Sequence, residues 1–195
     1  MGKRISESNR KTLETEISLS LDLDGSGKSK VSTGVGFFDH MLTLLSFHSH
    51  IDLEIKGKGD LEVCDHHLVE DCGILLGKAI REALGDKKGI RRYGHAVIPM
   101  DEALVESTLD ISGRSLLIFV GDFNREKVGD FSTEMAKEFF IALCREAGLN
   151  LHLEIRRGDN DHHKIEGIFK AFARSLREAI QVESDSLNSS KGILD

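Results

Sequence analysis

Cysteine is scarce in this sequence, and tryptophan is absent from it. The 195 residues include three cysteines, one tyrosine and one proline. Cys64, Cys72 and Cys144 are odd in number and show no Cys-x-x-Cys spacing, which argues against a disulfide framework. Reduced thiols are typical of the cytoplasm, so we expect a cytoplasmic protein.

Long apolar runs and an excess of basic residues are also missing. Apolar runs such as 116–120 are far too short to span a bilayer, which needs about 20 residues. No charged-then-apolar leader opens the sequence, so we expect no secretory signal and no membrane partner. The net charge of −7 argues against nucleic acid as the main partner, and any anionic ligand must meet a local basic cluster.

A six-residue pattern, Asp-His-His-x-x-Glu, is present twice, at 65–70 and at 161–166. Both copies run into an apolar pattern of helical period. Imidazole nitrogens and carboxylate oxygens are ligands of divalent transition ions. On a helix, the first histidine and the glutamate share a face, whereas adjacent histidines point about 100° apart. The pattern therefore predicts two metal ions, with neighbouring histidines divided between them.

The alternative is that this pattern binds no metal. A single His-His pair at the start of a helix is more often a solvated turn than a metal site. Here the whole pattern recurs at the same place in two similar halves, which favours metal binding. Cys64 is not counted as a ligand, because Asn160 takes its place in the second copy.

The rest of the sequence repeats as well, in the order strand, strand, helix, strand, helix. Alternating apolar residues predict strands, and apolar residues at helical spacing predict helices. In the first half these elements are expected at 13–23, 30–35, 37–48, 50–55 and 65–84, and in the second at 102–113, 114–120, 135–144, 151–155 and 162–180. The segment 30–35 is expected to return against the strand before it. Ser132 is expected to cap the helix at 135–144, and residues 1–11 to form a loose arm.

This order predicts an α+β fold in which helices cover one face of each mostly antiparallel sheet. The chain is then a single domain, residues 1–195, made of two repeated halves at about 11–90 and 96–182. The polar, serine-rich segment 183–195 follows as a C-terminal tail. A chain of 195 residues is long enough to bury the core of such a domain.

The repeat extends the ligand set beyond the two motifs. His40 lies early in the first short helix, and alignment of the halves places Glu138 opposite it. His48 lies two turns after His40 on the same helix face and is expected to border the pocket. The predicted metal ligands are His40, His66, His67, Glu70, Glu138, His162, His163 and Glu166.

One position breaks the repeat in an informative way. Lys170 extends the metal-facing stripe of its helix by one turn, where the first half has Ile74. Taken singly, such a lysine is more often a solvated surface charge. Together with Arg92, Arg114 and Lys191, however, it could form a phosphate pocket in an acidic protein.

These motifs resemble those of imidazoleglycerol-phosphate dehydratase, the lyase of histidine biosynthesis. The resemblance covers nearly the whole chain and rests mainly on the segments 36–42, 65–71, 100–103 and 161–172. It implies a duplicated fold of the ribosomal-protein-S5-domain-2-like type, which agrees with the repeat. It also implies assembly into a large shell of twenty-four subunits, with active sites at subunit boundaries.

The resemblance further implies two manganese ions per active site. Many members of the family carry histidine where this chain has Glu138, and a carboxylate is a competent Mn(II) ligand. The ligands that match the family are His40, His66, His67, Glu70, His162, His163 and Glu166. Substrate contacts are implied at Glu14, His40, His48, Arg92, Arg114, Lys170, Ser189, Ser190 and Lys191.

The reaction implied is metal-assisted elimination of water from imidazoleglycerol phosphate, giving imidazoleacetol phosphate. This substrate has no carbonyl group to acidify its carbon-bound proton. Two metal ions binding the ring as an imidazolate would stabilise negative charge there. Glu14, Glu70 and Glu166 are candidates for the general base that takes the neighbouring proton, and the sequence does not rank them.

Two other functions fit the His-His motif alone. A dinuclear hydrolase would use the ions to activate water as a nucleophile. A non-catalytic protein would use them for metal storage or for assembly. Lys170 argues against storage, which needs no cation beside the metal. Phosphate-dependent binding of an imidazole ligand would separate the dehydratase from the hydrolase.

Overall fold

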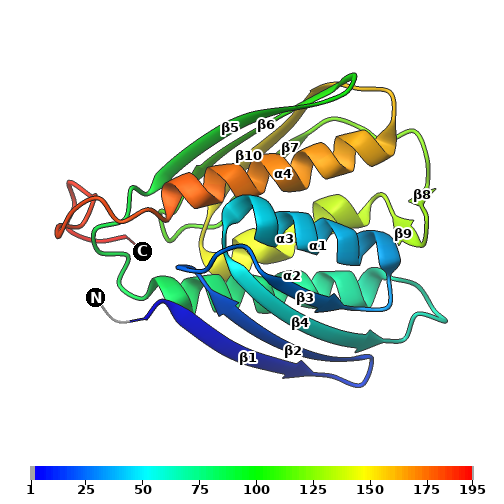
Figure 1. Cartoon of the computed structure of the whole chain (residues 1–195), viewed down its shortest axis with the longest axis horizontal. Coiled ribbons are helices and arrows are strands. Elements are labelled where there is room, and N and C mark those ends of the chain that lie inside the picture. The colour runs from blue at the N-terminus through cyan, green and yellow to red at the C-terminus, as the bar shows by residue number, and fades with distance from the viewer. Residues whose placement is uncertain (1–2, 195) are drawn as a thin grey trace.

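Within residues 3–194, which the computed structural model describes, two four-stranded sheets enclose a layer of helices (Figure 1). The first half consists of β1 (Ile5–Lys11), β2 (Thr15–Asp22), β3 (Ser29–Ser32), α1 (Gly36–Ser49), β4 (Asp52–Gly59) and α2 (His66–Leu84). The second half consists of β5 (Tyr93–Met100), β6 (Ala103–Asp110), β7 (Leu116–Val120), β8 (Lys127–Val128), β9 (Phe131–Ser132), α3 (Met135–Ala147), β10 (Asn150–Arg157) and α4 (Asp161–Ala179).

The two four-stranded sheets have the same topology. The first has the strand order β1-β2-β4-β3 and the second β5-β6-β10-β7. In each sheet the last pair is parallel and the other pairs are antiparallel. The prediction of a duplicated α+β fold is therefore confirmed, while the bounds of the halves, 11–90 and 96–182, stay a prediction.

Alternation of apolar residues explains why these segments form strands. In β2 the side chains of Ile17, Leu19 and Leu21 are buried, and the residues between them are not. Val105 and Leu109 are buried in the same way in β6. Successive side chains of a strand point to opposite faces of the sheet, so these apolar side chains face the helices and the polar ones lie on the outer face. Each buried side chain stabilises the fold by roughly 1.5–3 kcal/mol.

The helices link the two halves across the middle layer. α2 packs on the first sheet and α4 on the second. However, α1 packs against α4 of the other half, and α3 packs against α2. A residue on α1 is therefore brought beside α4, although the two helices belong to different halves of the sequence.

The equivalent helices α2 and α4 contact α3 in different ways. α2 and α3 approach closely at glycines, since a Cβ atom at Gly73 would lie 2.6 Å from the carbonyl oxygen of Phe139. At Gly77 it would lie 2.5 Å from the carbonyl oxygen of Leu143. In α4 the position that matches Gly73 is Phe169, whose ring centroid lies 5.4 Å from that of Phe139. Aromatic packing of this kind fills the layer between the sheets.

Three expectations for single segments are wrong. From Ile5 onward the expected loose arm is the edge strand β1, while Met1 and Gly2 lie outside the described residues. β3 does not return against β2, because β1 and β4 occupy both edges of β2, and it pairs with β4 instead. Ser132 does not cap α3: it lies in β9, and Glu134 holds the cap position without a side-chain hydrogen bond.

Candidate metal and active site

Both His-His motifs start helices at the same end of the molecule (Figure 1). His66 is the first residue of α2, and His162 is the second residue of α4. The side-chain oxygen of Asn160 caps α4 by accepting a 2.9 Å hydrogen bond from the backbone N–H of His162. The fold therefore gathers both copies of the motif on one side.

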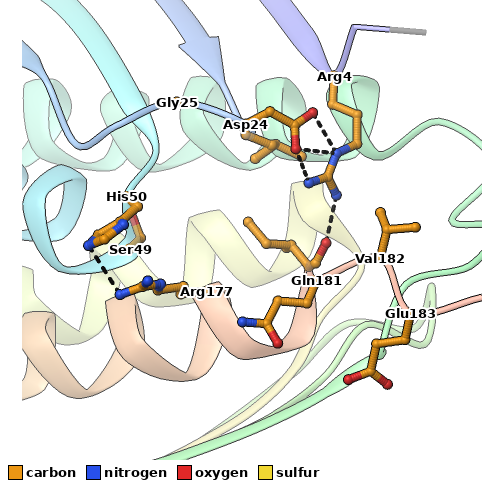
Figure 2. Close-up of a pocket in the computed structure, with 11 residues that line it drawn as sticks. Arg4, Asp24, Gly25, Ser49, His50, Arg177, Gln181, Val182 and Glu183 are labelled. Carbon is orange, nitrogen blue, oxygen red and sulfur yellow. Dashed lines mark hydrogen bonds and ion pairs between the residues drawn. The ribbon is translucent and has the colours of Figure 1, made fainter. Parts of the chain in front are cut away.

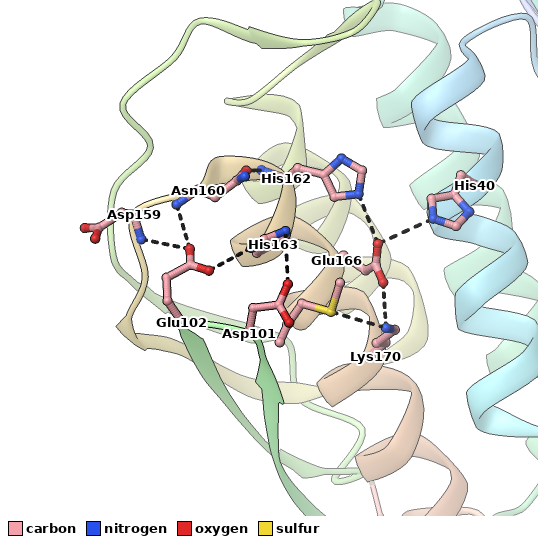
Figure 3. Close-up of polar contacts among 10 residues, drawn as sticks. His40, Asp101, Glu102, Asp159, Asn160, His162, His163, Glu166 and Lys170 are labelled. Atoms are coloured by element: carbon pink, nitrogen blue, oxygen red, sulfur yellow. Dashed lines mark hydrogen bonds and ion pairs between the residues drawn. The ribbon is translucent and has the colours of Figure 1, made fainter.

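Three side chains of the kinds that bind metal ions in proteins lie close together where α1 meets α4 (Figure 3). Oε2 of Glu166 is 3.1 Å from Nε2 of His162 and 3.4 Å from Nε2 of His40. The Glu166 side chain is 8% exposed, whereas those of His40 and His162 are 48% and 43% exposed. Among the described residues, these three form the one group with a ligand atom from each within 4.8 Å of the others.

Lys170 holds the second oxygen of the same glutamate (Figure 3). Its Nζ lies 2.5 Å from Oε1 of Glu166 and 3.6 Å from the sulfur of Met100. Burial opposes ionisation of Glu166, but the hydrogen bond and charge of Lys170 outweigh it and lower the pKa of that carboxyl. Burial and the nearby Lys170 charge also lower the pKa of His48. Glu166 is thus an anion with one oxygen turned to the histidines.

His163 points away from this group, toward two carboxylates (Figure 3). Its ring centroid is 6.0 Å from that of His162, and the two ring planes are 81° apart. Nδ1 of His163 lies 2.7 Å from Oε2 of Glu102, and Nε2 lies 3.6 Å from Oδ2 of Asp101. Asp101 has a left-handed φ of 49°, a conformation that non-glycine residues hold at some cost.

Glu102 is itself fixed by the backbone before α4. Its Oε1 accepts hydrogen bonds from the backbone N–H groups of Asn160, at 2.8 Å, and Asp159, at 3.2 Å. The hydrogen bond from Asn160, followed by that from His163, lowers the pKa of Glu102 to about 2. Glu102 is therefore ionised at neutral pH, and its hydrogen bond raises the pKa of His163.

The first copy of the motif assembles fewer donors. Nε2 of His66 lies 3.6 Å from Oε2 of Glu70, and Nη2 of Arg145 approaches Oε1 of Glu70 to 3.8 Å. Glu138 is half-buried on α3, and its side chain forms no hydrogen bond or ion pair with any described residue. The expected role of Glu138 as a ligand therefore stays a prediction.

His67 resembles His163 in having a carboxylate at each ring nitrogen. Nδ1 of His67 lies 3.2 and 3.1 Å from the two oxygens of Asp60. Its Nε2 lies 3.9 Å from Oε1 of Glu14, whose side chain is 54% exposed. The hydrogen bond to Asp60 raises the pKa of His67. In both copies the second histidine faces carboxylates and not the first histidine.

The predicted substrate-binding residues divide between the two ends of the molecule. Lys170 lies beside Glu166, but Arg92 lies at the C-terminal end of α4, where its backbone N–H donates to the carbonyl of Ala179 at 2.9 Å, and the tail follows there (Figure 1). Arg92 donates to both oxygens of Asp110, at 2.7 and 3.0 Å, and to the carbonyl of Asn188 at 2.9 Å. Arg114 is exposed after β6, and Ser189, Ser190 and Lys191 follow in the tail. One chain therefore does not bring the full set together.

A separate cavity of about 410 Å³ lies between the ends of α1 and α4 (Figure 2). On one side, Arg4 pairs with Asp24 and donates to the carbonyl of Ile180 at 2.6 Å. On the other, Nη1 of Arg177 lies 3.1 Å from Nε2 of His50. None of the predicted site residues lines this cavity. It is therefore distinct from the three-donor group.

Sequence reasoning missed the carboxylates that hold the second histidines. Asp60 and Asp101 belong to no repeated motif, because they occupy loops that differ between the halves. Glu102 did carry a signal, since it aligns with Glu14 in the repeat. Their contacts depend on how the turns fold over the helix starts, which the spacing along the chain does not determine.

A buried ion pair at the start of α4 was also missed. Nζ of Lys164 lies 2.9 Å from Oδ1 of Asp161, and these side chains are 5% and 1% exposed. The other oxygen of Asp161 accepts backbone hydrogen bonds from Asn124, at 2.8 Å, and Arg125, at 2.7 Å. The pair thus ties the loop after β7 to the helix that carries His162 and His163.

The fold and the site together define a class: a duplicated α+β chain that presents imidazole and carboxylate groups at the starts of its helices. None of the described helices is both long enough and apolar enough to cross a membrane. The family model of imidazoleglycerol-phosphate dehydratase matches residues 33–176. The chain belongs to this family, as the sequence motifs predicted.

Individual relatives match over nearly their full length. The imidazoleglycerol-phosphate dehydratase of Streptococcus sanguinis (strain SK36) is 54% identical over 193 residues, covering 98% of this chain and 100% of that protein. That of Clostridium botulinum (strain Alaska E43 / Type E3) is 53% identical over 195 residues, covering 100% of both. The crystal structure of the Staphylococcus aureus enzyme is 44% identical, with a TM-score of 0.83, covering 91% of this chain and 99% of that one.

Proposed function

We propose that this chain is a manganese-dependent lyase that eliminates water from imidazoleglycerol phosphate in histidine biosynthesis. The observation that carries the proposal is the group of His40, His162 and Glu166, in a member of the dehydratase family. The product would be imidazoleacetol phosphate. A cytoplasmic location agrees with the three free cysteines, two of which are buried.

The donors present fit a divalent ion such as Mn(II). Imidazole nitrogen and carboxylate oxygen are both suitable, and Glu166 is ionised and partly desolvated. His40, His162 and Glu166 would hold one ion, and the remaining donors would come from His66, His67, Glu70, Glu138 and His163. When bound, the ions supply Lewis acidity that stabilises negative charge on the substrate's imidazole ring.

A complete site requires more than one copy of the chain. The described residues contain one group of three donors, and the first copy of the motif has its side chains elsewhere on the surface. Arg92 and the tail lie at the C-terminal end of α4, whereas the His-His motif lies at its start. These separations support a large homo-oligomer, of twenty-four subunits by family resemblance, in which neighbouring chains complete each active site.

Glu14 is the best-placed general base of the three candidates. Glu166 is held by Lys170 and two histidines, and Glu70 faces His66 and Arg145. Among the described residues, the carboxylate of Glu14 has only the contact with His67, at 3.9 Å, and it is the most exposed of the three. It is therefore free to take the carbon-bound proton next to the departing hydroxyl group.

The cations would bind and orient the phosphate group. Lys170 lies beside the three-donor group, so its ammonium would meet a substrate bound there. Arg92, Arg114 and Lys191 would reach the same phosphate from a neighbouring subunit, with Ser189 and Ser190 as hydroxyl donors. Arg92 is already aligned by its two hydrogen bonds to Asp110. Binding of the phosphate would fix the imidazole ring relative to Glu14.

The decisive test is dehydration of imidazoleglycerol phosphate by chelator-stripped protein, before and after addition of Mn(II). We expect turnover only with metal, together with a particle mass close to twenty-four chains in native mass spectrometry. A folded protein that binds manganese but does not turn the substrate over would contradict the dehydratase assignment. Full activity of the chelator-stripped protein would contradict the metal dependence but not the dehydratase assignment.

A further inference from the structure

The second histidine of each motif is held by a carboxylate at Nδ1. Glu102 Oε2 lies 2.7 Å from Nδ1 of His163, and Asp60 lies 3.1 Å from Nδ1 of His67. An ionised carboxylate can only accept a hydrogen bond, so each Nδ1 must carry the proton. Neutral imidazole has one N–H, which leaves the lone pair on Nε2.

We infer that Glu102 and Asp60 are positioning residues that fix His163 and His67 as the Nδ1–H tautomer, and so reserve Nε2 for a metal ion. This inference rests on the proposed function for the identity of the ligand at Nε2. Metal-binding histidines generally donate their other N–H to a carboxylate or carbonyl, and loss of that partner costs about 10–100-fold in metal affinity.

The two carboxylates differ in how firmly they are held. Oε1 of Glu102 accepts two backbone N–H groups, from Asp159 and Asn160, while Oε2 faces His163. The side chain of Asp60 has no described partner besides His67, and both of its oxygens lie at similar distances from Nδ1. Glu102 is thus fixed in orientation, whereas Asp60 is free to turn.

Because of this difference, replacing each carboxylate by the corresponding amide has opposite effects on the tautomers of the two histidines. In Glu102→Gln, the two backbone N–H groups require the amide oxygen at the Oε1 position, which places the NH₂ group against Nδ1 of His163. The ring must then accept at Nδ1 and carry its proton on Nε2. In Asp60→Asn, the amide can rotate to offer its oxygen to His67, so the Nδ1–H tautomer is kept.

The first measurement is the tautomer itself in metal-free protein. Solid-state NMR of histidine ¹⁵N-labelled full-length chain at alkaline pH distinguishes Nδ1–H from Nε2–H rings, and His163→Gln identifies the resonances of His163. We expect Nδ1–H for His163 in the parent protein and Nε2–H in Glu102→Gln. An Nε2–H ring in the parent, or an unchanged tautomer in the variant, would overturn the inference.

The second measurement is calorimetric titration with Mn(II) alone. We expect Glu102→Gln to weaken binding of one ion by about 10–100-fold, and Asp60→Asn to weaken it much less. Glu154→Gln, an exposed change on the outer face of β10, is the control and should leave affinity unchanged. Equal losses in Glu102→Gln and Asp60→Asn would contradict the argument from orientation.

The two measurements distinguish failure of the proposed function from failure of the tautomer inference. If the parent protein binds no manganese, the metal assignment fails, whereas the tautomer of His163 still tests the hydrogen bond from Glu102. If Glu102→Gln does not fold, Glu102→Ala replaces it, because water can then occupy either role at Nδ1. A single Nδ1–H form of His163 in that variant would show that Glu102 does not select the tautomer.

Discussion

The two halves of this chain share one topology but hold their His-His motifs in different surroundings. In the second half, Glu166 is joined by His40 from the other half and by Lys170. In the first half, Glu70 is joined by Arg145, and Ile74 takes the place of the lysine. The repeat therefore provides two equal scaffolds, and a few substituted side chains give each a separate role.

The helix contacts differ in the same way. α2 meets α3 through glycines, while the matching position in α4 is Phe169, packed in an aromatic cluster. Close backbone approach and ring packing both fill the middle layer, but they respond differently to mutation. The four predictions below test this comparison, beginning with the largest expected effect.

Lys164→Leu gives α4 the residue that α2 has at the matching position, the buried Leu68. Asp161 would then be left buried without its cation, and we expect a loss of about 3–5 kcal/mol in stability. Thermal denaturation at fixed protein concentration measures this. The double variant Asp161→Asn with Lys164→Leu should recover part of the loss, and no recovery would mean that the ion pair is not the cause.

His40→Ala and Glu138→Ala compare the two short helices directly. His40 belongs to the three-donor group, so its loss should lower kcat/KM by about 100-fold or more, since a metal ion contributes several kcal/mol to catalysis. We expect a smaller loss for Glu138→Ala. Steady-state kinetics with saturating Mn(II) measures kcat/KM for both variants. Equal losses would make Glu138 a full counterpart of His40.

Gly73→Ala tests the close contact between α2 and α3. The new Cβ would lie 2.6 Å from the carbonyl oxygen of Phe139, so the backbone must shift, at an expected cost of about 1–3 kcal/mol. The shift in denaturation midpoint relative to Lys78→Ala, an exposed change on the same helix, measures it. A Gly73→Ala variant as stable as the parent would show that α2 and α3 can separate at this point without cost.

Lys30→Ala removes an exposed ion pair between β3 and β4 and should have the smallest effect. Nζ of Lys30 lies 3.3 Å from Oε2 of Glu54, and both side chains are more than half exposed. Such a pair contributes about 0–1 kcal/mol. We expect a change close to the lower end of that range in the same denaturation assay. A loss as large as that of Gly73→Ala would contradict this assignment.

Much of the fold could be predicted because the same pattern of apolar and polar residues occurs in both halves of the sequence. The strand at 13–23 and its copy near 102–113 each alternate apolar and polar residues, and the segments lie at β2 and β6. The edge strand β1 was missed, because its alternation is weak and one of its faces is solvated. Pairing of β3 with β4 was missed because it depends on which strand edges remain free.

For the candidate site, the sequence by itself determined the chemistry of each motif. Neighbouring histidines on a helix must diverge, and the first histidine must face the glutamate one turn later, since both follow from helical geometry. The repeated Asp-His-His-x-x-Glu pattern and the family membership follow from the same residues.

Only the tertiary structure decided which side chains meet. His40 reaches His162 and Glu166 because α1 packs against the helix of the other half, a contact between residues more than a hundred positions apart. Glu102 orients His163 because a tight turn of β5 and β6 lies over the start of α4. Local spacing fixes the face of a helix, but the long-range packing of buried surfaces sets which face it meets.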